Sequence, residues 1–210
     1  MSLKPSFALV LALAGGAVAL TTLNIVAQEG ETALLRPRSN TQRSDPGLGT
    51  GHAAPAWRNT SWLNTPDGKP LTVASLKGRV VLLNFWTFTC YNCRGALPSM
   101  VSYDRQYRDQ GLTVIGIHSP EFPPYGGEHD KKNVADAMTR HEIGYAVAQD
   151  NDHATWNLYN IQYWPSYVLI DRTGKIRWEG YGEFHVGDSN HRDVERRIQT
   201  LLAEPVPAGS

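Results

Sequence analysis

A mostly apolar, β-branched run, Arg-Val-Val-Leu-Leu-Asn-Phe-Trp at residues 79–86, lies near the middle of the chain. Such a run predicts a central strand that is buried on both faces. Apolar side chains then recur at three- and four-residue spacings through 94–110 until Gly111, which predicts a helix that ends at this glycine. Residues 112–117 are apolar again, so the order strand, helix, strand predicts parallel pairing with a right-handed crossover.

The second half of the chain continues this pattern. Residues 132–141 predict a short helix, and the amphipathic stretch 188–202 predicts a last one. Between them, apolar runs at 167–170 and 175–178 flank Asp-Arg-Thr-Gly, whose Asp and Gly suit a hairpin turn. We therefore expect an α/β domain in which helices flank a central mixed sheet.

The N-terminal segment, 1–28, has a different character. After Lys4 no charged residue occurs up to Gln28, and an apolar run lies at the centre of this stretch. Such a segment is typical of an export signal or a membrane anchor. Cleavage after Ala19 would release the protein, whereas an uncleaved segment would anchor it with Lys4 on the cytoplasmic side. Either outcome predicts an extracytoplasmic location, in the periplasm or cell envelope.

Residues 29–56 are polar and interrupted by proline and glycine, which is typical of a flexible linker. The N-terminal extension thus comprises the signal or anchor and this linker. We expect one folded domain of ordinary size at 57–203 and a short tail at 204–210.

Charge and cysteine content narrow the function. Twenty Lys and Arg balance twenty Asp and Glu, so no basic field attracts nucleic acid, and we expect no such partner. The chain has two cysteines, which excludes a scaffold held together by several disulfides. We expect a monomer that contacts the membrane through its N-terminal anchor.

The two cysteines form the motif Cys90-Tyr91-Asn92-Cys93 between the first predicted strand and the following helix. A thiolate near a helix N-terminus is stabilised by unpaired N–H groups and by the helix dipole. Cys90 is therefore the predicted nucleophile. Cys93 lies one turn inside the helix and is the predicted resolving thiol, which attacks a mixed disulfide.

Three other uses of the pair are weaker. A zinc site needs about four ligands, and no histidines are paired at finger-like spacing. A structural disulfide would close too short a loop to stabilise the fold much. A haem attachment site needs His after the second cysteine, where Arg94 stands. We expect no metal and no cofactor apart from the redox-active disulfide.

The stretch from Asn84 to Cys93, with Pro98 beyond it, resembles the active-site strand, turn and kinked helix of the thioredoxin superfamily. It is most similar to the membrane-tethered TlpA/ResA group. The Trp-Thr-x-x-Cys-x-Asn-Cys pattern, the segment 118–122 and Tyr-Trp-Pro at 163–165 resemble the soluble domain of DipZ-type proteins, which are associated with cytochrome c biogenesis. DipZ-type chains usually carry a multi-span electron-importing domain, and this sequence does not.

The resemblance implies a thioredoxin-like fold and several further site residues. Pro165 corresponds to the cis-proline beside the active-site sulfurs, and Trp164 would then lie on the partner-binding surface. Trp86, Tyr91 and Asn92 are further candidates for substrate contact, and Tyr91 and Asn92 are also expected to tune the redox potential.

Two positions depart from the family pattern. Asn84 replaces the buried Asp of thioredoxins, and Ala96 replaces the Glu of ResA-type enzymes. Cys93 still has to lose a proton, so another base or water must accept it. Glu121 and His118 are the candidates, because both follow the second strand at the carboxyl edge of the sheet. His118 would alternatively act as a cation that lowers a thiol pKa.

The leading hypothesis is a thiol-disulfide oxidoreductase that reduces protein disulfides outside the cytoplasm, such as those of apocytochromes c, with electrons from a membrane donor. Oxidation or isomerisation of exported proteins would use the same pair at another potential. A thiol peroxidase is an alternative because Thr87 lies three residues before Cys90 as in peroxiredoxins, although Leu83 replaces their proline. A Cu(I) chaperone would use the cysteines with His153 or His185.

Overall fold

The computed structural model describes residues 51–123 and 126–207. The predicted signal or anchor, 1–28, lies outside the described residues, and so does most of the predicted linker, 29–56. Among the residues that are described, no helix is both long and apolar enough to cross a membrane.

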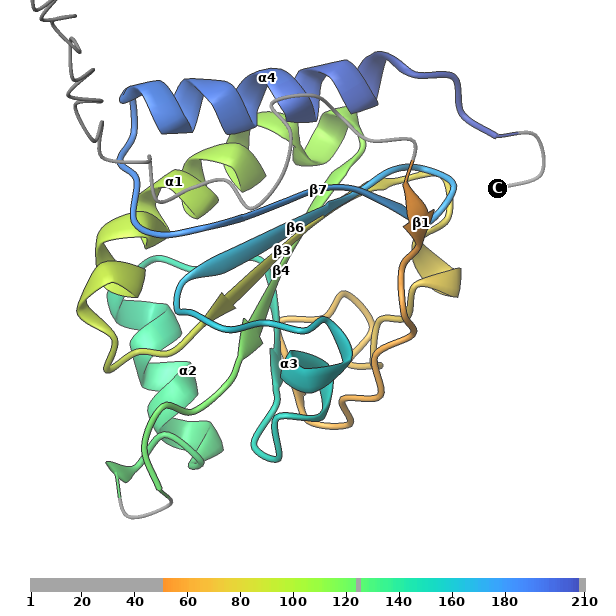
Figure 1. Ribbon diagram of the computed structural model, residues 1–210. Coiled ribbons are helices and arrows are strands. Elements are labelled where there is room, and N and C mark those ends of the chain that lie inside the picture. The colour runs from red at the N-terminus through yellow and green to blue at the C-terminus, as the bar shows by residue number, and fades with distance from the viewer. Residues whose placement is uncertain (1–50, 124–125, 208–210) are drawn as a thin grey trace, which may run out of the picture. The chain divides into compact units, whose positions relative to one another are not determined.

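A single mixed sheet runs through the described part of the chain, in the order β1-β7-β6-β3-β4-β5-β2 (Figure 1). β3 pairs in parallel with β4, and β4 with β5, whereas β6 and β7 run antiparallel. The strands are β1 (His52–Ala53), β2 (Trp62–Leu63), β3 (Val80–Trp86), β4 (Leu112–His118), β5 (Ala146–Gln149), β6 (Ser166–Ile170) and β7 (Lys175–Tyr181).

The helices cover both faces of this sheet. α1 and α4 lie over one face, and the short α3 lies over the other (Figure 1). The helical elements are α1 (Tyr91–Tyr107), α2 (Lys131–Arg140), α3 (Ala154–Leu158) and α4 (Ser189–Ala203), with 3-10 turns η1 (Ala74–Leu76) and η2 (Arg108–Gln110). The predicted α/β class, with a mixed sheet and flanking helices, is confirmed.

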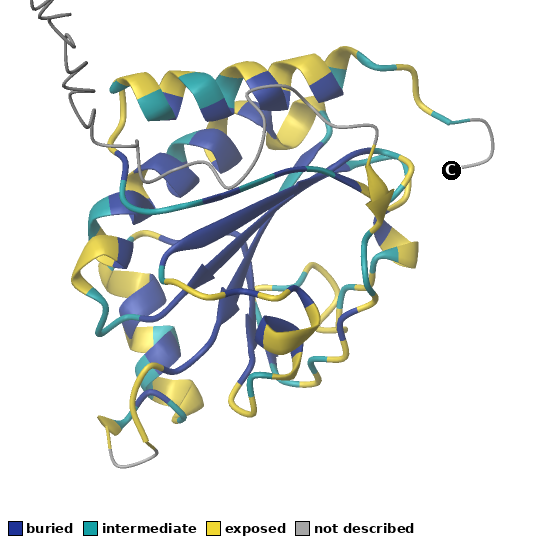
Figure 2. Ribbon diagram, viewed as in Figure 1, coloured by how far each residue is buried: buried dark blue, intermediate teal, exposed yellow. Residues whose placement is uncertain are grey.

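Every residue of β3 is buried, as Figure 2 shows for the centre of the sheet. Alternate side chains point to opposite faces of a strand, so Trp86 packs in one core with α1, α2 and α4. Phe85 packs in the other core against Trp156 and Tyr159. Two buried faces explain why the sequence of β3 is apolar without alternation.

Most predicted elements are present, with small differences at their ends. The active-site helix begins at Tyr91 rather than Arg94, and Gly111 takes the left-handed conformation (φ 107°) after it. The prediction missed β1, β2, β5 and α3. His52 and Ala53 pair with β7, so the structured part begins inside the stretch that was predicted to be linker.

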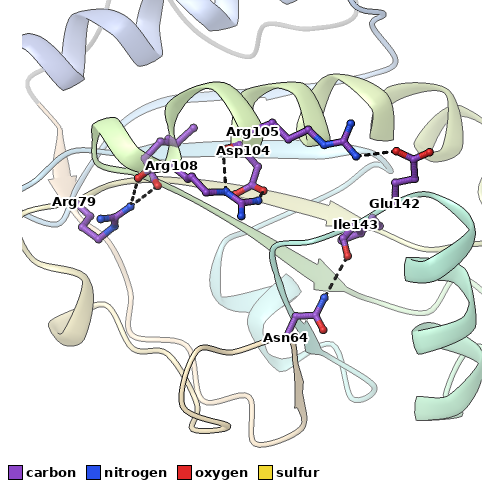
Figure 3. A network of polar contacts seen from close by, with 8 residues as sticks. Asn64, Arg79, Asp104, Arg105, Arg108, Glu142 and Ile143 are labelled. Carbon is purple, nitrogen blue, oxygen red and sulfur yellow. Dashed lines mark hydrogen bonds and ion pairs between the residues drawn. The ribbon is translucent and has the colours of Figure 1, made fainter.

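Polar contacts gather at the amino ends of β3 and β4 (Figure 3). Arg79 donates to the carbonyl oxygens of Arg108 and Leu112 and to Thr113 Oγ1. The ion pair between Arg105 and Glu142 measures 2.7 Å, and both side chains are largely exposed (63% and 71%). These amino ends form the edge of the sheet opposite to the carboxyl ends, where the cysteines lie.

Candidate active site

The cysteine pair lies at the carboxyl end of β3, where the chain turns into α1. Cys90 is the N-cap of α1, in an extended conformation, and its Sγ accepts a hydrogen bond from the N–H of Cys93 at 3.2 Å. Both cysteines are free thiols, Cys90 partly exposed and Cys93 only 1% exposed. The structure therefore presents one sulfur to a partner and keeps the other inside the protein.

The same geometry separates the acidities of the two thiols. A hydrogen bond from the Cys93 thiol, helped by the N–H groups of Cys93 and Asn92, holds the pKa of Cys90 below its usual value, although burial and the charge of Glu121 oppose this. Burial, followed by the hydrogen bond to Cys90, raises the pKa of Cys93 far above its usual value. Cys90 is thus the thiol that ionises first, as expected of a nucleophile.

His118 ends β4 next to Trp86 of β3, and its side chain is completely buried. The imidazole stacks on Phe88 at 5.4 Å and lies edge-on to Trp86 at 5.2 Å between ring centroids. Burial lowers the pKa of His118 to about 4, although the charge of Glu128 opposes this shift. With its pKa lowered in this way the ring is neutral near pH 7, which does not favour the alternative prediction that it acts as a cation.

Glu121 is exposed, and its backbone N–H donates to Glu128 Oε2 at 3.0 Å. The charge of Glu121 raises the pKa of both thiols, which places its carboxylate in the electrostatic neighbourhood of the pair. The structure thus brings both predicted proton acceptors to the edge that carries the cysteines, one buried and neutral and the other in water.

Sequence reasoning missed Glu128, a carboxylate buried at this edge. It accepts hydrogen bonds from the hydroxyls of Thr87 and Thr89 and from the N–H groups of Glu121 and Phe122. Burial raises the pKa of Glu128, but these hydrogen bonds outweigh that effect and lower it overall. Glu128 therefore ties the segment before Cys90 to the segment after β4.

The predicted cis-proline segment follows α3 and opens β6. The Trp164–Pro165 peptide bond is cis, as the resemblance implied. The indole of Trp164 packs against Trp156 in a tilted arrangement, 4.1 Å between ring centroids, and donates to the carbonyl oxygen of Ser119. Trp164 is therefore partly buried, whereas Tyr163, whose ring lies tilted against Tyr181, is 55% exposed.

The structure separates the remaining predicted contact residues. Trp86 is completely buried, so the prediction that it contacts substrate is wrong. Tyr91 is 76% exposed beside Cys90, and Asn92 is exposed as well. Asn84 and Ala96, at the positions where relatives carry carboxylates, are both buried.

The histidines considered for copper have other contacts. His153 Nε2 lies 2.7 Å from the carbonyl oxygen of Pro120, and His185 pairs with Glu183. Within 51–123 and 126–207, no three His, Cys, Asp or Glu side chains are arranged so that they could hold a metal ion.

Comparisons with known proteins place this chain in a family. The sequence pattern of the AhpC/TSA family matches residues 50–179. The protein DipZ of Mycobacterium bovis is 43% identical over 148 residues, which are 70% of this chain and 20% of that protein. The chain therefore spans about a fifth of the length of this relative.

Two further proteins match over most of their length. The thiol-disulfide oxidoreductase YkuV of Bacillus subtilis is 28% identical over 144 residues, which are 69% of this chain and 89% of that protein. The crystal structure of a thiol-disulfide isomerase from Corynebacterium glutamicum superposes with a TM-score of 0.61 at 23% identity, over 72% of this chain and 98% of the other. The latter likeness supports the thioredoxin-like fold.

Proposed function

The chain belongs to the AhpC/TSA family, as a thiol-disulfide oxidoreductase of thioredoxin-like fold, and we propose that it reduces protein disulfides outside the cytoplasm. The observation that carries this proposal is the contrast between the two thiols. Cys90 is partly exposed with a lowered pKa, whereas Cys93 is buried with a raised one. That contrast suits a nucleophile and a resolving thiol.

The reaction proceeds in two exchanges. The Cys90 thiolate attacks one sulfur of the substrate disulfide, forms a mixed disulfide and displaces the other substrate sulfur, which takes up a proton. Cys93 then gives its proton to a base and attacks Cys90 Sγ. This step forms the Cys90–Cys93 disulfide and releases the second substrate thiol. The substrate disulfide is reduced to two thiols while the protein dithiol is oxidised.

His118 is the base that we assign to Cys93. It is neutral and buried, and it packs against Trp86, which belongs to the same core as Cys93, and against Phe88, which borders that core. Its Nδ1 has no hydrogen-bond partner among the described residues. Glu121 is the weaker candidate because its side chain is exposed to water, and water competes with it as an acceptor of the Cys93 proton.

Substrate recognition would use exposed aromatic side chains around the pair. Tyr91 follows Cys90, Phe122 follows Glu121, and Tyr163 lies in the cis-proline segment, and each is at least half exposed. Amphipathic rings of this kind are enriched at protein interfaces.

The compartment, the substrate class and the electron donor extend this proposal. The predicted N-terminal signal or anchor supports an extracytoplasmic site, and the likeness to DipZ supports a role in cytochrome c maturation. A membrane protein with a dithiol of its own would re-reduce the Cys90–Cys93 disulfide, by the same exchange in reverse.

Trapping the partner tests the function. In Cys93→Ser the mixed disulfide on Cys90 cannot be resolved, so the full chain should accumulate a covalent complex that dithiothreitol releases and mass spectrometry identifies. Cys90→Ser is the matched control and should trap nothing. Equal trapping by both variants would contradict the assignment of the nucleophile.

The redox equilibrium with glutathione tests the direction. A reductase should have a potential near that of thioredoxin, about −270 mV, whereas a strong oxidant such as DsbA lies at about −120 mV. A value at the oxidising end would overturn the proposed direction and leave the dithiol chemistry intact.

A further inference from the structure

Thr87 is the point at which three groups of the site meet. Its Oγ1 contacts a carboxylate oxygen of Glu128 and lies 3.3 Å from Nε2 of His118. Its backbone N–H forms a hydrogen bond with the Cys93 thiol that lowers the pKa of this thiol. All four residues are buried. The Thr87 hydroxyl therefore connects the Glu128 carboxylate with the His118 imidazole, next to the resolving thiol of Cys93.

Because the Thr87 hydroxyl has a single hydrogen, its contacts determine which nitrogen of the His118 imidazole carries the proton. A threonine hydroxyl has one hydrogen, and a carboxylate can only accept, so Thr87 donates to Glu128. The same oxygen must then accept from His118, which requires the proton of the imidazole to be on Nε2. Nδ1 is left without a proton, and it is the nitrogen without a hydrogen-bond partner among the described residues. This tautomer is the one that can take up a proton at Nδ1.

The environment of Glu128 makes the arrangement specific for a carboxylate. Oε1 accepts from Thr87 and Thr89, and Oε2 accepts from the N–H groups of Glu121 and Phe122. A glutamine amide has one oxygen and one NH₂ group, so it could satisfy only one of these two pairs. Where the amide oxygen of Gln accepts from the two N–H groups, the Thr87 hydroxyl is free to donate to His118 instead.

We propose that Glu128 is a positioning residue of the dithiol site, which acts through Thr87 to hold His118 in the Nε2–H tautomer and so keeps Nδ1 available to the proton of Cys93. The inference rests on the proposed function, since it assumes that His118 is the proton acceptor. Besides Glu128, the charged or titratable group that influences His118 is His129, whose charge opposes protonation. No step requires Glu128 to lose or gain a proton.

The experiment measures the tautomer and the chemistry separately. In the ¹⁵N-labelled full chain at pH 7, long-range ¹H–¹⁵N correlation should show His118 with the proton on Nε2. Glu128→Gln and Thr87→Val should both shift the ring to the Nδ1–H tautomer or to a mixture. Thr87→Ser, which keeps the hydroxyl, should restore the native tautomer.

Thr89→Val is the matched control. It removes the other hydroxyl that donates to Glu128 and leaves the contact between Thr87 and His118 in place, so the tautomer should stay as in the native protein. The native tautomer in both Glu128→Gln and Thr87→Val would overturn the inference. If Glu128→Gln does not fold, the comparison of Thr87→Val with Thr87→Ser decides alone, and a native tautomer in Thr87→Val would overturn it as well.

The second readout is the rate at which Cys93 releases a mixed disulfide preformed on Cys90 with glutathione. The variants with the altered tautomer should release it at least tenfold more slowly, since a positioned base contributes about 10²–10⁴-fold. An altered tautomer with an unchanged release rate would support the role of Glu128 and overturn that of His118. A native tautomer in these variants, together with slow release in His118→Asn, would support His118 as the base and overturn the role of Glu128.

Discussion

The two ends of the parallel strands use the same kinds of polar side chain in opposite ways. At the carboxyl end, Glu128 is buried and accepts hydrogen bonds from two segments of the chain. At the amino end, Arg105 and Glu142 meet as an ion pair in water, and Arg79 bonds to carbonyl groups near the surface (Figure 3).

The comparison shows that solvent access decides how much a polar contact contributes. Water replaces the partner of an exposed ion pair almost fully, so such pairs stabilise proteins by about 0–1 kcal/mol. A buried donor that loses its acceptor has no such replacement and costs about 1–3 kcal/mol. We therefore expect substitutions at the two ends to differ widely in effect.

The largest effect is expected for Glu128→Ala. The substitution leaves two hydroxyls and two N–H groups without their acceptor, so the free energy of unfolding should fall by about 3 kcal/mol or more. Urea denaturation measures this, with Glu142→Ala as the matched acidic control. A loss below about 1 kcal/mol would mean that water enters this end as freely as the other.

The next effect concerns pH. The pKa of His118 falls from an ordinary 6.5 to about 4 in the folded state because of burial, so between these values the unfolded chain binds a proton that the folded chain does not. Stability should therefore decrease as the pH falls from 6.5 to 4, by about 2–3 kcal/mol for this residue.

His118→Asn isolates that contribution. His141 and His191 also have lowered pKa values because of burial, so the native protein loses stability through them as well. The difference between the native protein and the variant in urea denaturation, measured across this pH range, belongs to His118. Parallel curves would contradict its assignment as a buried neutral base.

Arg79 provides an intermediate case at the amino end. Arg79→Ala removes three hydrogen bonds, two of them to carbonyl oxygens, at a partly buried site that water can reach. We expect a loss of about 1–2 kcal/mol. Arg79→Lys keeps the charge without the planar fork, and it should recover only part of this loss in the same denaturation assay.

The smallest effect is expected for the Arg105–Glu142 pair. Each alanine variant should change stability by less than about 0.5 kcal/mol, and a double-mutant cycle should give a coupling energy of the same size. A coupling above about 1 kcal/mol would remove the contrast between the two ends.

Sequence patterns were sufficient where an element is long and its environment uniform. β3 was predicted because its apolar run extends over the whole strand, and α1 because its apolar side chains recur over several helical turns. β5 and α3 are short, and Ala146–Gln149 includes two alanines, so its strand conformation depends on pairing with β4 rather than on its own composition. The two-residue strands β1 and β2 leave no pattern at all.

The sequence predicted the part of the site that lies in the Cys-x-x-Cys motif. Cys90 and Cys93 followed from their spacing between strand and helix. Glu128, however, lies in a loop seven residues after Glu121, and the sequence does not tell which of the two carboxylates turns inward. The burial of Trp86 does follow from the sequence, because a strand predicted to be buried on both faces places Trp86 in a core and not at a surface.

The two short strands at the borders of the sheet affect how copies of the protein behave beside one another. An open edge strand offers free N–H and C=O groups to a neighbouring molecule and promotes aggregation. Within the described residues the borders are β1 and β2, each of two residues, and the part of β7 beyond β1 carries Arg177 and Glu179. Short borders and charged side chains both discourage edge-to-edge association, which should favour solubility at high concentration.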